Sequence, residues 1–261
     1  MQVSQFSQNN TNSSARNLLP LKDFPVLETE RYILKLASTE AELESVFRLR
    51  FKVFNMEMGL GYSTSHFTQM DKDEFDAFFH HLILVLKQTG QTIGSYRMQT
   101  YTMASQGLGF RAAKYFNLNA ITNSILSVTV ELGRACIAKE YRDIQALSLL
   151  WKGLANYLVW SGNKYFLGCS TLPTQNYWHA RCAYNYFQQN GFMHPSILVY
   201  PNSQFLLELP QQCPDSWKVE ISHILQLYLA NGAKICSLPC IDRQFNSIEF
   251  LTIFNGKDFA K

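Results

Sequence analysis

Net charge, long apolar runs and metal-spaced cysteines are all scarce in this 261-residue chain. Its 23 Lys and Arg residues nearly balance 20 Asp and Glu, for a net charge of +3. Because no basic run occurs either, the sequence gives no support to a nucleic-acid partner. No apolar run approaches the roughly 18 to 20 residues that span a bilayer. We therefore expect a cytoplasmic protein that makes at most peripheral contact with the inner membrane.

The six cysteines form no CxxC pair, show no zinc-ligand spacing and accompany no export signal. This usage is typical of reduced cytosolic thiols, and we expect no metal site. The sequence also lacks GxGxxG, P-loop and GxSxG motifs, which argues against dinucleotide, nucleoside triphosphate and serine-hydrolase sites. We expect no permanently bound cofactor.

The residues that are present fit one globular α/β domain. Apolar residues make up 47% of the chain, enough for a sizeable core. Residues 1–27 are rich in Ser, Asn and Gln, and we predict a flexible N-terminal arm there, followed by a single domain over 28–261. Periodicity and capping signals predict strands at 32–37, 81–87, 92–99, 127–137 and 165–169, two strands within 196–209, and helices at 40–56, 144–161, 175–190 and 217–230. This order predicts a mixed central sheet flanked by helices.

The most informative segment is Val130–Ile137, where charged residues and a glycine interrupt a buried strand. Glycine inside such a strand indicates a bulge or a close approach by another group. A one-residue bulge at Gly133 would bring Glu131 and Arg134, three positions apart, to one face of the strand. By itself this pair fits a structural ion pair as well as a catalytic one.

Other charged residues also break the apolar pattern. Arg50 lies on the apolar face of the predicted first helix, Arg97 lies within a strand, and Asp73 and Asp76 belong to an acidic loop. Each has an ordinary explanation, because a lone Arg can reach solvent and an acidic loop is usually hydrated. Buried ions without partners cost several kcal/mol, however, so we expect these groups to converge on one another or on a ligand.

Several of these segments together resemble a known enzyme family. In chain order they are Leu49–Phe54, Asp73–Asp76, Gly94–Arg97, Glu131–Arg134, Tyr141–Arg142, Leu150–Gly153, Gly168–Ser170 and Pro239–Asn246. This ordered set resembles the acyl-carrier-protein-dependent N-acyltransferases of the GNAT superfamily, in particular the ornithine N-alpha-acyltransferase (hemolysin-like) branch, over roughly residues 28–255. Acyl-homoserine-lactone synthases and N-acyl amino acid synthases share some of its elements.

The resemblance implies a fold and a donor. The fold would be the GNAT sheet, splayed at a bulged fourth strand, with pantetheine lying in the splay near Gly133. The donor would be the acyl-4'-phosphopantetheine of acyl-carrier protein, which Arg142 would help to bind. Acetyl-CoA-binding members carry a glycine-rich turn after the fourth strand, whereas the corresponding segment here, Arg142–Leu147, has no glycine and contains an acid. This departure favours a carrier-protein donor. A tryptophan that autoinducer synthases usually place after the first helix is also missing, which disfavours a homoserine-lactone product.

The resemblance further implies aminolysis of a long-chain, in some relatives 3-hydroxylated, acyl thioester by the α-amine of an amino acid such as ornithine. Glu131 is the expected general base, with Arg134 beside it at the reaction centre. Asp73 and Asp76 would hold the acceptor's cationic groups, and Arg50 or Arg97 its carboxylate. The alternatives are another N-acyl amino acid synthase, a lactone synthase, an acetyl-CoA enzyme and a non-catalytic membrane-active protein.

Overall fold

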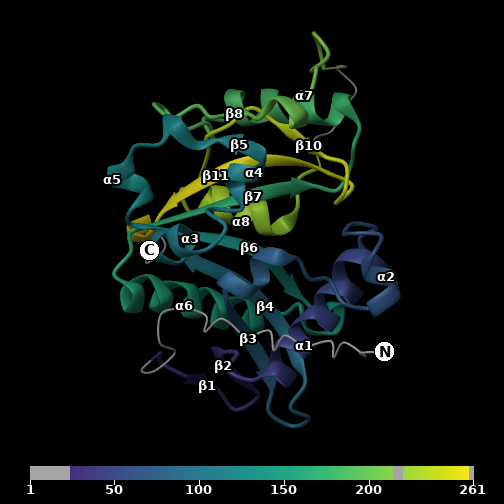
Figure 1. Cartoon of the computed structure of the whole chain (residues 1–261), viewed down its shortest axis with the longest axis vertical. Helices are drawn as coiled ribbons and strands as arrows, with labels where there is room; N and C mark the ends of the chain where they lie inside the picture. The colour runs from purple at the N-terminus through teal and green to yellow at the C-terminus, as the bar shows by residue number, and fades with distance from the viewer. Residues whose placement is uncertain (1–23, 214–219, 259–261) are drawn as a thin grey trace, which may run out of the picture.

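The computed structural model describes residues 24–213 and 220–258 as a mixed sheet with helices on both faces (Figure 1). The main sheet has the strand order β1-β2-β3-β4-β6-β7-β11-β10, and β9 pairs with β11. The strands are β1 (Leu27–Glu28), β2 (Tyr32–Leu36), β3 (His80–Leu86), β4 (Thr92–Thr100), β6 (Thr129–Ile137), β7 (Tyr165–Leu172), β9 (Lys234–Ile235), β10 (Cys240–Asp242) and β11 (Ser247–Asn255). The predicted fold class is confirmed.

The helices are mostly short. They are α1 (Glu40–Arg50), α2 (Ser65–Thr68), α3 (Tyr101–Gln106), α4 (Ala112–Tyr115), α5 (Asn123–Leu126), α6 (Ile144–Ser161), α7 (Tyr177–Gln189) and α8 (His223–Ala230). A π-helix, η1 (Phe51–Glu57), continues α1, and a 3-10 helix, η2 (Glu74–Phe78), covers the acidic loop. A separate small sheet pairs β5 (Phe116–Asn117) with β8 (Tyr200–Pro201). Three-residue 3-10 turns occur at Leu118–Ala120, Lys139–Tyr141, Ser203–Phe205 and Gly256–Asp258.

Alternation along β3 places helices on both faces of the sheet. Leu82 and Leu84 pack in the core that includes α6 residues such as Leu150, whereas Ile83 packs with Val46 of α1 on the other face. Helix α6 matches its predicted span because Asp143 caps its first turn and Gly162 ends it in the left-handed conformation. No helix of the described residues is long and apolar enough to cross a membrane.

Some predictions fail in the C-terminal part of the chain. Two strands were predicted within 196–209, but this segment contains one strand, the two-residue β8. The helix predicted at 217–230 is α8, which begins at His223; residues 217–219 lie outside the described residues. The nine-residue strand β11 was not predicted, although it pairs with β7 over eight positions. Residues 1–23 of the predicted arm also lie outside the described residues, whereas Phe24 is buried against Tyr157 and Trp160.

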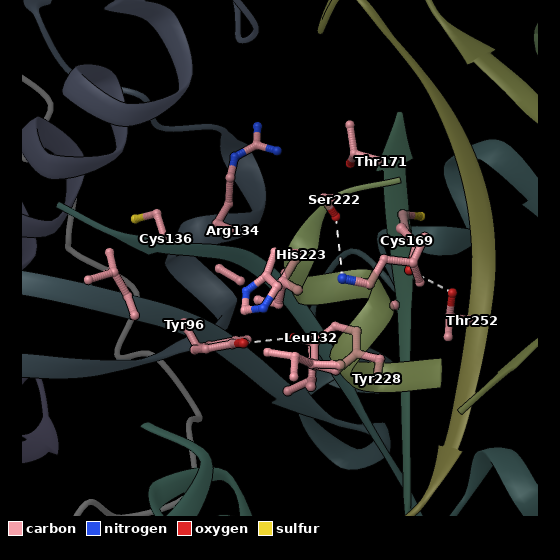
Figure 2. Close-up of a pocket in the computed structure, with 18 of the residues that line it drawn as sticks. Tyr96, Leu132, Arg134, Cys136, Cys169, Thr171, Ser222, His223, Tyr228 and Thr252 are labelled. Carbon is pink, nitrogen blue, oxygen red and sulfur yellow. Dashed lines mark hydrogen bonds between the residues drawn. The ribbon is translucent and has the colours of Figure 1, made fainter. Parts of the chain in front are cut away.

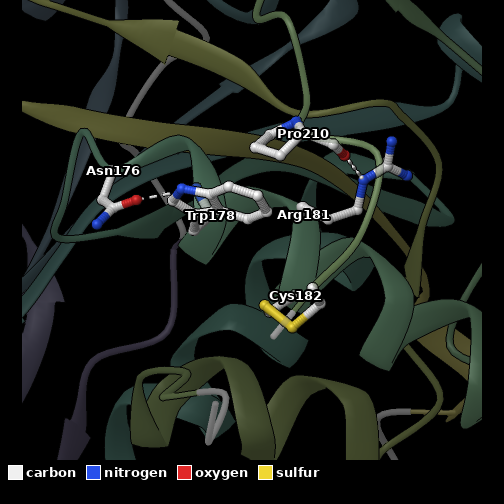
Figure 3. The surroundings of a disulfide bond; sticks show 6 residues. Asn176, Trp178, Arg181, Cys182 and Pro210 are labelled. Atoms are coloured by element: carbon white, nitrogen blue, oxygen red, sulfur yellow. Dashed lines mark hydrogen bonds between the residues drawn. A yellow bond between two sulfur atoms is a disulfide. The ribbon is translucent and has the colours of Figure 1, made fainter. Parts of the chain in front are cut away.

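The prediction that all six thiols are reduced is wrong for one pair. Cys182 of α7 is joined to Cys213 in a disulfide, with the two Cα atoms 5.2 Å apart (Figure 3). The neighbouring Arg181 donates from its guanidinium to the carbonyl of Pro210, so two contacts hold this loop against α7. The two cysteines are 31 positions apart and carry no spacing signal, so only the folded chain brings them together.

The predicted bulge is present in β6. Ser95 pairs with Cys136 and Arg97 pairs with Gly133, so two residues of β6 lie opposite Tyr96 alone. The left-handed residue is Arg134, with φ 50°, rather than the glycine before it. Gly133 instead makes room for a neighbour, because a Cβ there would lie 3.3 Å from the Nε of Arg97.

The sheet divides immediately after this point. Strands β6 and β7 are its one parallel pair, and their pairing runs only from Thr129–Tyr165 to Leu132–Gly168. At Gly168 the backbones are so close that a Cβ would lie 2.7 Å from the carbonyl oxygen of Leu132. Beyond it the two strands separate, which leaves the β7-facing edge of β6 without a strand partner.

Candidate functional site

A largely apolar cavity of about 570 Å³ occupies the splay between β6 and β7. Its walls come from residues 132–137 of β6, residues 166–171 of β7, α8, the start of α6 and η1. Tyr96 and Tyr228 share a hydroxyl hydrogen bond of 2.7 Å at one end of the view, and Arg134 lies toward the other (Figure 2). Such a shape fits an elongated apolar group that carries a polar head.

The predicted charged residues converge beside this cavity, on a buried ion cluster. Asp76 accepts hydrogen bonds at 2.8 Å from Nη1 of both Arg50 and Arg97 through one oxygen. Its second oxygen accepts from the backbone N–H of Asp73, because the two acids form a capping box on η2. Burial alone would raise the pKa of Asp76, but the two guanidiniums outweigh it and hold the pKa well below the usual range.

Asp73 is the second anion of the cluster. Arg97 grips it with both terminal nitrogens, at 2.7 and 3.0 Å. Burial raises the pKa of Asp73, yet the Arg97 charge prevails and lowers it to about 2. Arg97 itself is 1% exposed and lies over the ring of Phe79, 4.8 Å from its centroid. This bidentate geometry makes the pair rigid.

Arg134 connects the ion cluster to the cavity. Its Nε donates to Asp71 at 2.8 Å, and Nη2 lies 3.5 Å from Asp73. Its guanidinium carbon is 4.2 Å from the ring centroid of Phe245, and the rings of Phe54 and Tyr62 lie within 6 Å. Arg134 lines the cavity, and its Nη2 has no hydrogen-bond partner among the described residues.

A fourth arginine, Arg111, was missed by sequence reasoning. It lies 3.7 Å from Asp73 and 3.8 Å from Asp242, and it donates to the hydroxyl of Tyr115, which in turn donates to Asp242. Residue 111 stands in a weakly patterned stretch before α4, so periodicity offered no signal. The acidic loop did point to Asp73 and Asp76, but nothing local pointed to this partner.

The expected pair of Glu131 with Arg134 is wrong. The left-handed turn at Arg134 sends its side chain to Asp71, while Glu131 points to another segment. The carboxylate of Glu131 accepts from Gln99 Nε2 at 2.6 Å and from the backbone N–H groups of Arg111 at 2.8 Å and Ala112 at 2.6 Å. Burial raises the pKa of Glu131, and these three donors oppose the rise. These contacts indicate that Glu131 fixes the position of the segment that carries Arg111.

The other predicted site residues divide into two groups. In the described chain, Gly133, Arg134 and Arg142 line the cavity. Arg50, Asp76, Arg97 and Glu131 are buried outside its walls, and so is the side chain of Asp73, which is 4% exposed. The terminal nitrogens of Arg50 already bond Asp76 and His81, so the expected grip of Arg50 on an acceptor carboxylate does not fit this arrangement. The four residues predicted to touch the acceptor bond one another outside the cavity walls, and one of them, Asp73, lies 3.5 Å from Arg134.

The turn before α6 contains Arg142 and Asp143 and is the place where the acyl donor was expected to bind. Arg142 is an exposed residue whose Nη2 bonds Glu57 at 2.7 Å, and its Nε donates to the carbonyl of Ile137. Asp143 caps α6 by accepting from the N–H of Ala146 at 2.8 Å. A carboxylate thus occupies the helix N-terminus, where a bound phosphate would otherwise be stabilised.

The ion cluster predicts loss of stability in acid. Arg50 can only donate, so His81 Nδ1 accepts from it, and Nε2 donates to the carbonyl of Asp76. Burial and the Arg50 charge lower the pKa of His81 to about 3. Because the folded-state pKa values of His81 and Asp73 are both depressed, the stability they contribute is present above their unfolded values of 6.5 and 3.8 and is lost below them.

The free energy of unfolding, measured by urea titration, should therefore fall as the pH drops from 6.5 toward 3, and again between about 4 and 2. The second phase through Asp73 alone amounts to about 2 kcal/mol. His81→Gln, which keeps an acceptor for Arg50 but does not titrate, should remove the first phase selectively. An unfolding free energy that is constant from pH 7 to 4 in the wild type contradicts this account.

Comparison with known proteins shows which enzymes the chain resembles. A family model described as acetyltransferase (GNAT) domain matches residues 49–152. The chain is similar to the L-ornithine N(alpha)-acyltransferase of Brucella abortus, with 31% identity over 53% of this chain and 52% of the relative. It also aligns with the enzyme of that name from Agrobacterium fabrum, with 25% identity over 87% of this chain and 81% of the relative. Several of the curated relatives are matched over only about half their length.

Among solved structures, the AHL synthase LasI superposes with a TM-score of 0.48 and 13% identity, over 86% of this chain and 90% of that one. Residues 49–152 thus match a GNAT acetyltransferase domain, and the chain is similar to the L-ornithine N(alpha)-acyltransferases, as the sequence motifs predicted.

Proposed function

We propose that the protein transfers a long-chain acyl group from the phosphopantetheine thioester of acyl-carrier protein to the α-amine of an amino acid. The observation that carries this proposal is the apolar cavity in the β6–β7 splay, which ends at an arginine backed by buried carboxylates. The names of the curated relatives support ornithine as the acceptor. The acyl chain and pantetheine would fill the cavity, and the acceptor would enter at its charged end.

The residues divide this work between them. Arg134, which lines the cavity, would contact the acceptor carboxylate, while Asp71 and Asp73 fix the orientation of its guanidinium. The backbone N–H groups of β6 beyond Leu132 would donate to the oxyanion that forms when the amine attacks the thioester carbonyl. One such donor commonly contributes about 3 kcal/mol. The cluster is stabilised by three residues that lie outside the cavity walls, Arg50, Arg97 and Asp76.

A carrier-protein donor is favoured over CoA by the turn at Arg142–Asp143. Asp143 already caps α6, so its carboxylate occupies the N–H groups that would otherwise bind the pyrophosphate of CoA. We expect kcat/KM to be at least tenfold higher for acyl-carrier protein than for the matching acyl-CoA, and to fall as salt rises, because carrier proteins are acidic. Asp143→Ser, which keeps a cap without charge, should improve use of acyl-CoA only. Equal efficiency with both donors in the wild type contradicts the donor assignment.

The function itself is tested by a panel of donors and acceptors. Purified protein is incubated with acyl-carrier protein of several chain lengths, with and without a 3-hydroxyl, and with ornithine, lysine, glycine or S-adenosylmethionine. Mass spectrometry should detect an N-acyl amino acid, and free thiol should appear in equal amount. A lactone product would favour the synthase alternative. Leakage of vesicles without acyl transfer would favour the membrane-active alternative and overturn the proposal.

Membrane contact through residues 54–60 receives little support from the fold. The patch that could make such contact consists of Phe54, Met56, Met58 and Leu60. Phe54 and Leu60 are 7% and 4% exposed and belong to the core, so half of this patch is unavailable. Only Met56 and Met58 of that patch are exposed. Their small area would give weak and reversible binding at most.

A further inference from the structure

A second buried carboxylate, Glu249 of β11, reaches the cavity through a single hydroxyl. Glu249 is 4% exposed and lies directly opposite Thr171 in the antiparallel β7–β11 ladder. Thr171 Oγ1 lies 2.8 and 3.0 Å from its two carboxylate oxygens, and Ser247 Oγ donates to it at 2.7 Å. Both partners of this acid are therefore hydroxyls.

Thr171 is the member of this group that lines the cavity. In Figure 2 it lies toward the same end of the view as the guanidinium of Arg134 and away from Tyr96 and Tyr228. The hydroxyl has one hydrogen, which it gives to Glu249, so the lone pairs of Oγ1 remain for a donor in the cavity. A protonated amine held at this end of the cavity is such a donor.

Glu131 and Glu249 differ in the chemistry of the groups that donate hydrogen bonds to them. Glu131 is surrounded by N–H donors of Gln99, Arg111 and Ala112, and an amide N–H does not pass a proton on. A hydroxyl can accept one proton while it releases another. Of these two buried acids, only Glu249 is thus connected to the cavity by a group that can conduct a proton.

We propose that Thr171 and Glu249 form a relay that removes the proton the acceptor amine must lose before it attacks the thioester. The ammonium proton passes to Thr171 Oγ1 while the Thr171 hydroxyl proton passes to Glu249. The amine nitrogen then forms the bond to the thioester carbon, the C–S bond breaks, and the second amine proton goes to the departing pantetheine sulfur. The products are an amide, a free thiol and one proton, which leaves Glu249 by the same path. This inference rests on the proposed function.

The surroundings of Glu249 suit a temporary proton. The titratable and charged groups near it are Arg111, Asp242, Cys169 and Cys240. Burial raises the pKa of Glu249, while the hydrogen bonds from Ser247 and Thr171 and the Arg111 charge act in the opposite direction. A general base works best when its pKa lies near the working pH, and burial moves Glu249 toward it.

The test compares pH profiles of Thr171→Val, Thr171→Ser and Glu249→Gln in the full chain. We expect Thr171→Val and Glu249→Gln to lower kcat at pH 7 about a hundredfold, in the range of a lost general base. Their rates should then rise tenfold per pH unit, because hydroxide or the free amine replaces the relay. Thr171→Ser retains the hydroxyl and should keep kcat within about threefold of the wild type, with an unchanged profile.

Thr252→Val is the matched control. Its hydroxyl also belongs to a cavity-lining threonine, but it bonds Ser170 Oγ at 2.7 Å rather than a carboxylate. This variant should keep the wild-type shape of the pH profile, whatever its kcat. If Thr171→Val retains that shape too, the relay is wrong although the proposed function stands. If the wild type forms no N-acyl product with any donor and acceptor, the proposed function and the relay both fall.

Discussion

Asp76→Asn is expected to lower the free energy of unfolding by about 3–5 kcal/mol, the usual cost of removing one partner from a buried ion pair. Asp76 bonds both Arg50 and Arg97, whose side chains are 0% and 1% exposed. Asparagine preserves the size of the side chain but not its charge. Arg97 would keep its contact with Asp73, whereas Arg50 would lose the one carboxylate that it bonds among the described residues, so the penalty comes from uncompensated charge rather than from lost packing.

Glu44→Gln provides the control on the same helix as Arg50. Glu44 bonds Arg48 at 2.7 Å, one turn away, and both side chains are about half exposed. Such a pair contributes about 0.3–0.5 kcal/mol. Urea titration at pH 7 measures both variants. Similar small losses for Asp76→Asn and Glu44→Gln would show that the buried cluster is not held by its charges.

Glu131→Gln is expected to lower turnover at least about a hundredfold. The carboxylate accepts three N–H donors, and a glutamine would turn its own NH2 toward at least one of them. The segment that carries Arg111 would shift, and with it Asp73, the anion that Arg111 shares with Arg97 and Arg134. A displacement of about 1 Å at a reacting centre is enough for a hundredfold loss.

The pH dependence separates two roles for Glu131. If it holds the Arg111 segment, the loss in Glu131→Gln should be equal at pH 7 and pH 9. If it is the general base that the family resemblance implies, activity should recover as the pH rises. Circular dichroism checks that the variant is folded, and Glu140→Gln, which removes an exposed partner of Lys52, serves as the neutral comparison. Turnover near the wild-type value in folded Glu131→Gln would remove this residue from the site.

Local sequence signals predicted most of the elements that carry the site. The strong three-and-four spacing from Ile144 to Leu158, with a glycine after it, predicted α6 closely. Alternation and β-branching predicted β3, β4 and β6 within a few residues. These features depend on neighbours in the chain, so periodicity reports them. Strand β11 has no such pattern because both of its faces are buried.

The sequence by itself determined that ions would be buried and that β6 would bulge near Gly133, and the family resemblance implied that the sheet would splay there. Only the tertiary structure decided which ions meet. The left-handed backbone of Arg134 sends it to Asp71 instead of Glu131, and the β7–β11 register places Glu249 behind Thr171. The physical reason is the sequence distance over which each property is set. A charge in an apolar strand needs a partner, and this need can be recognised from the neighbouring residues alone. Which residue becomes the partner depends on strand register and loop closure between residues far apart in the chain.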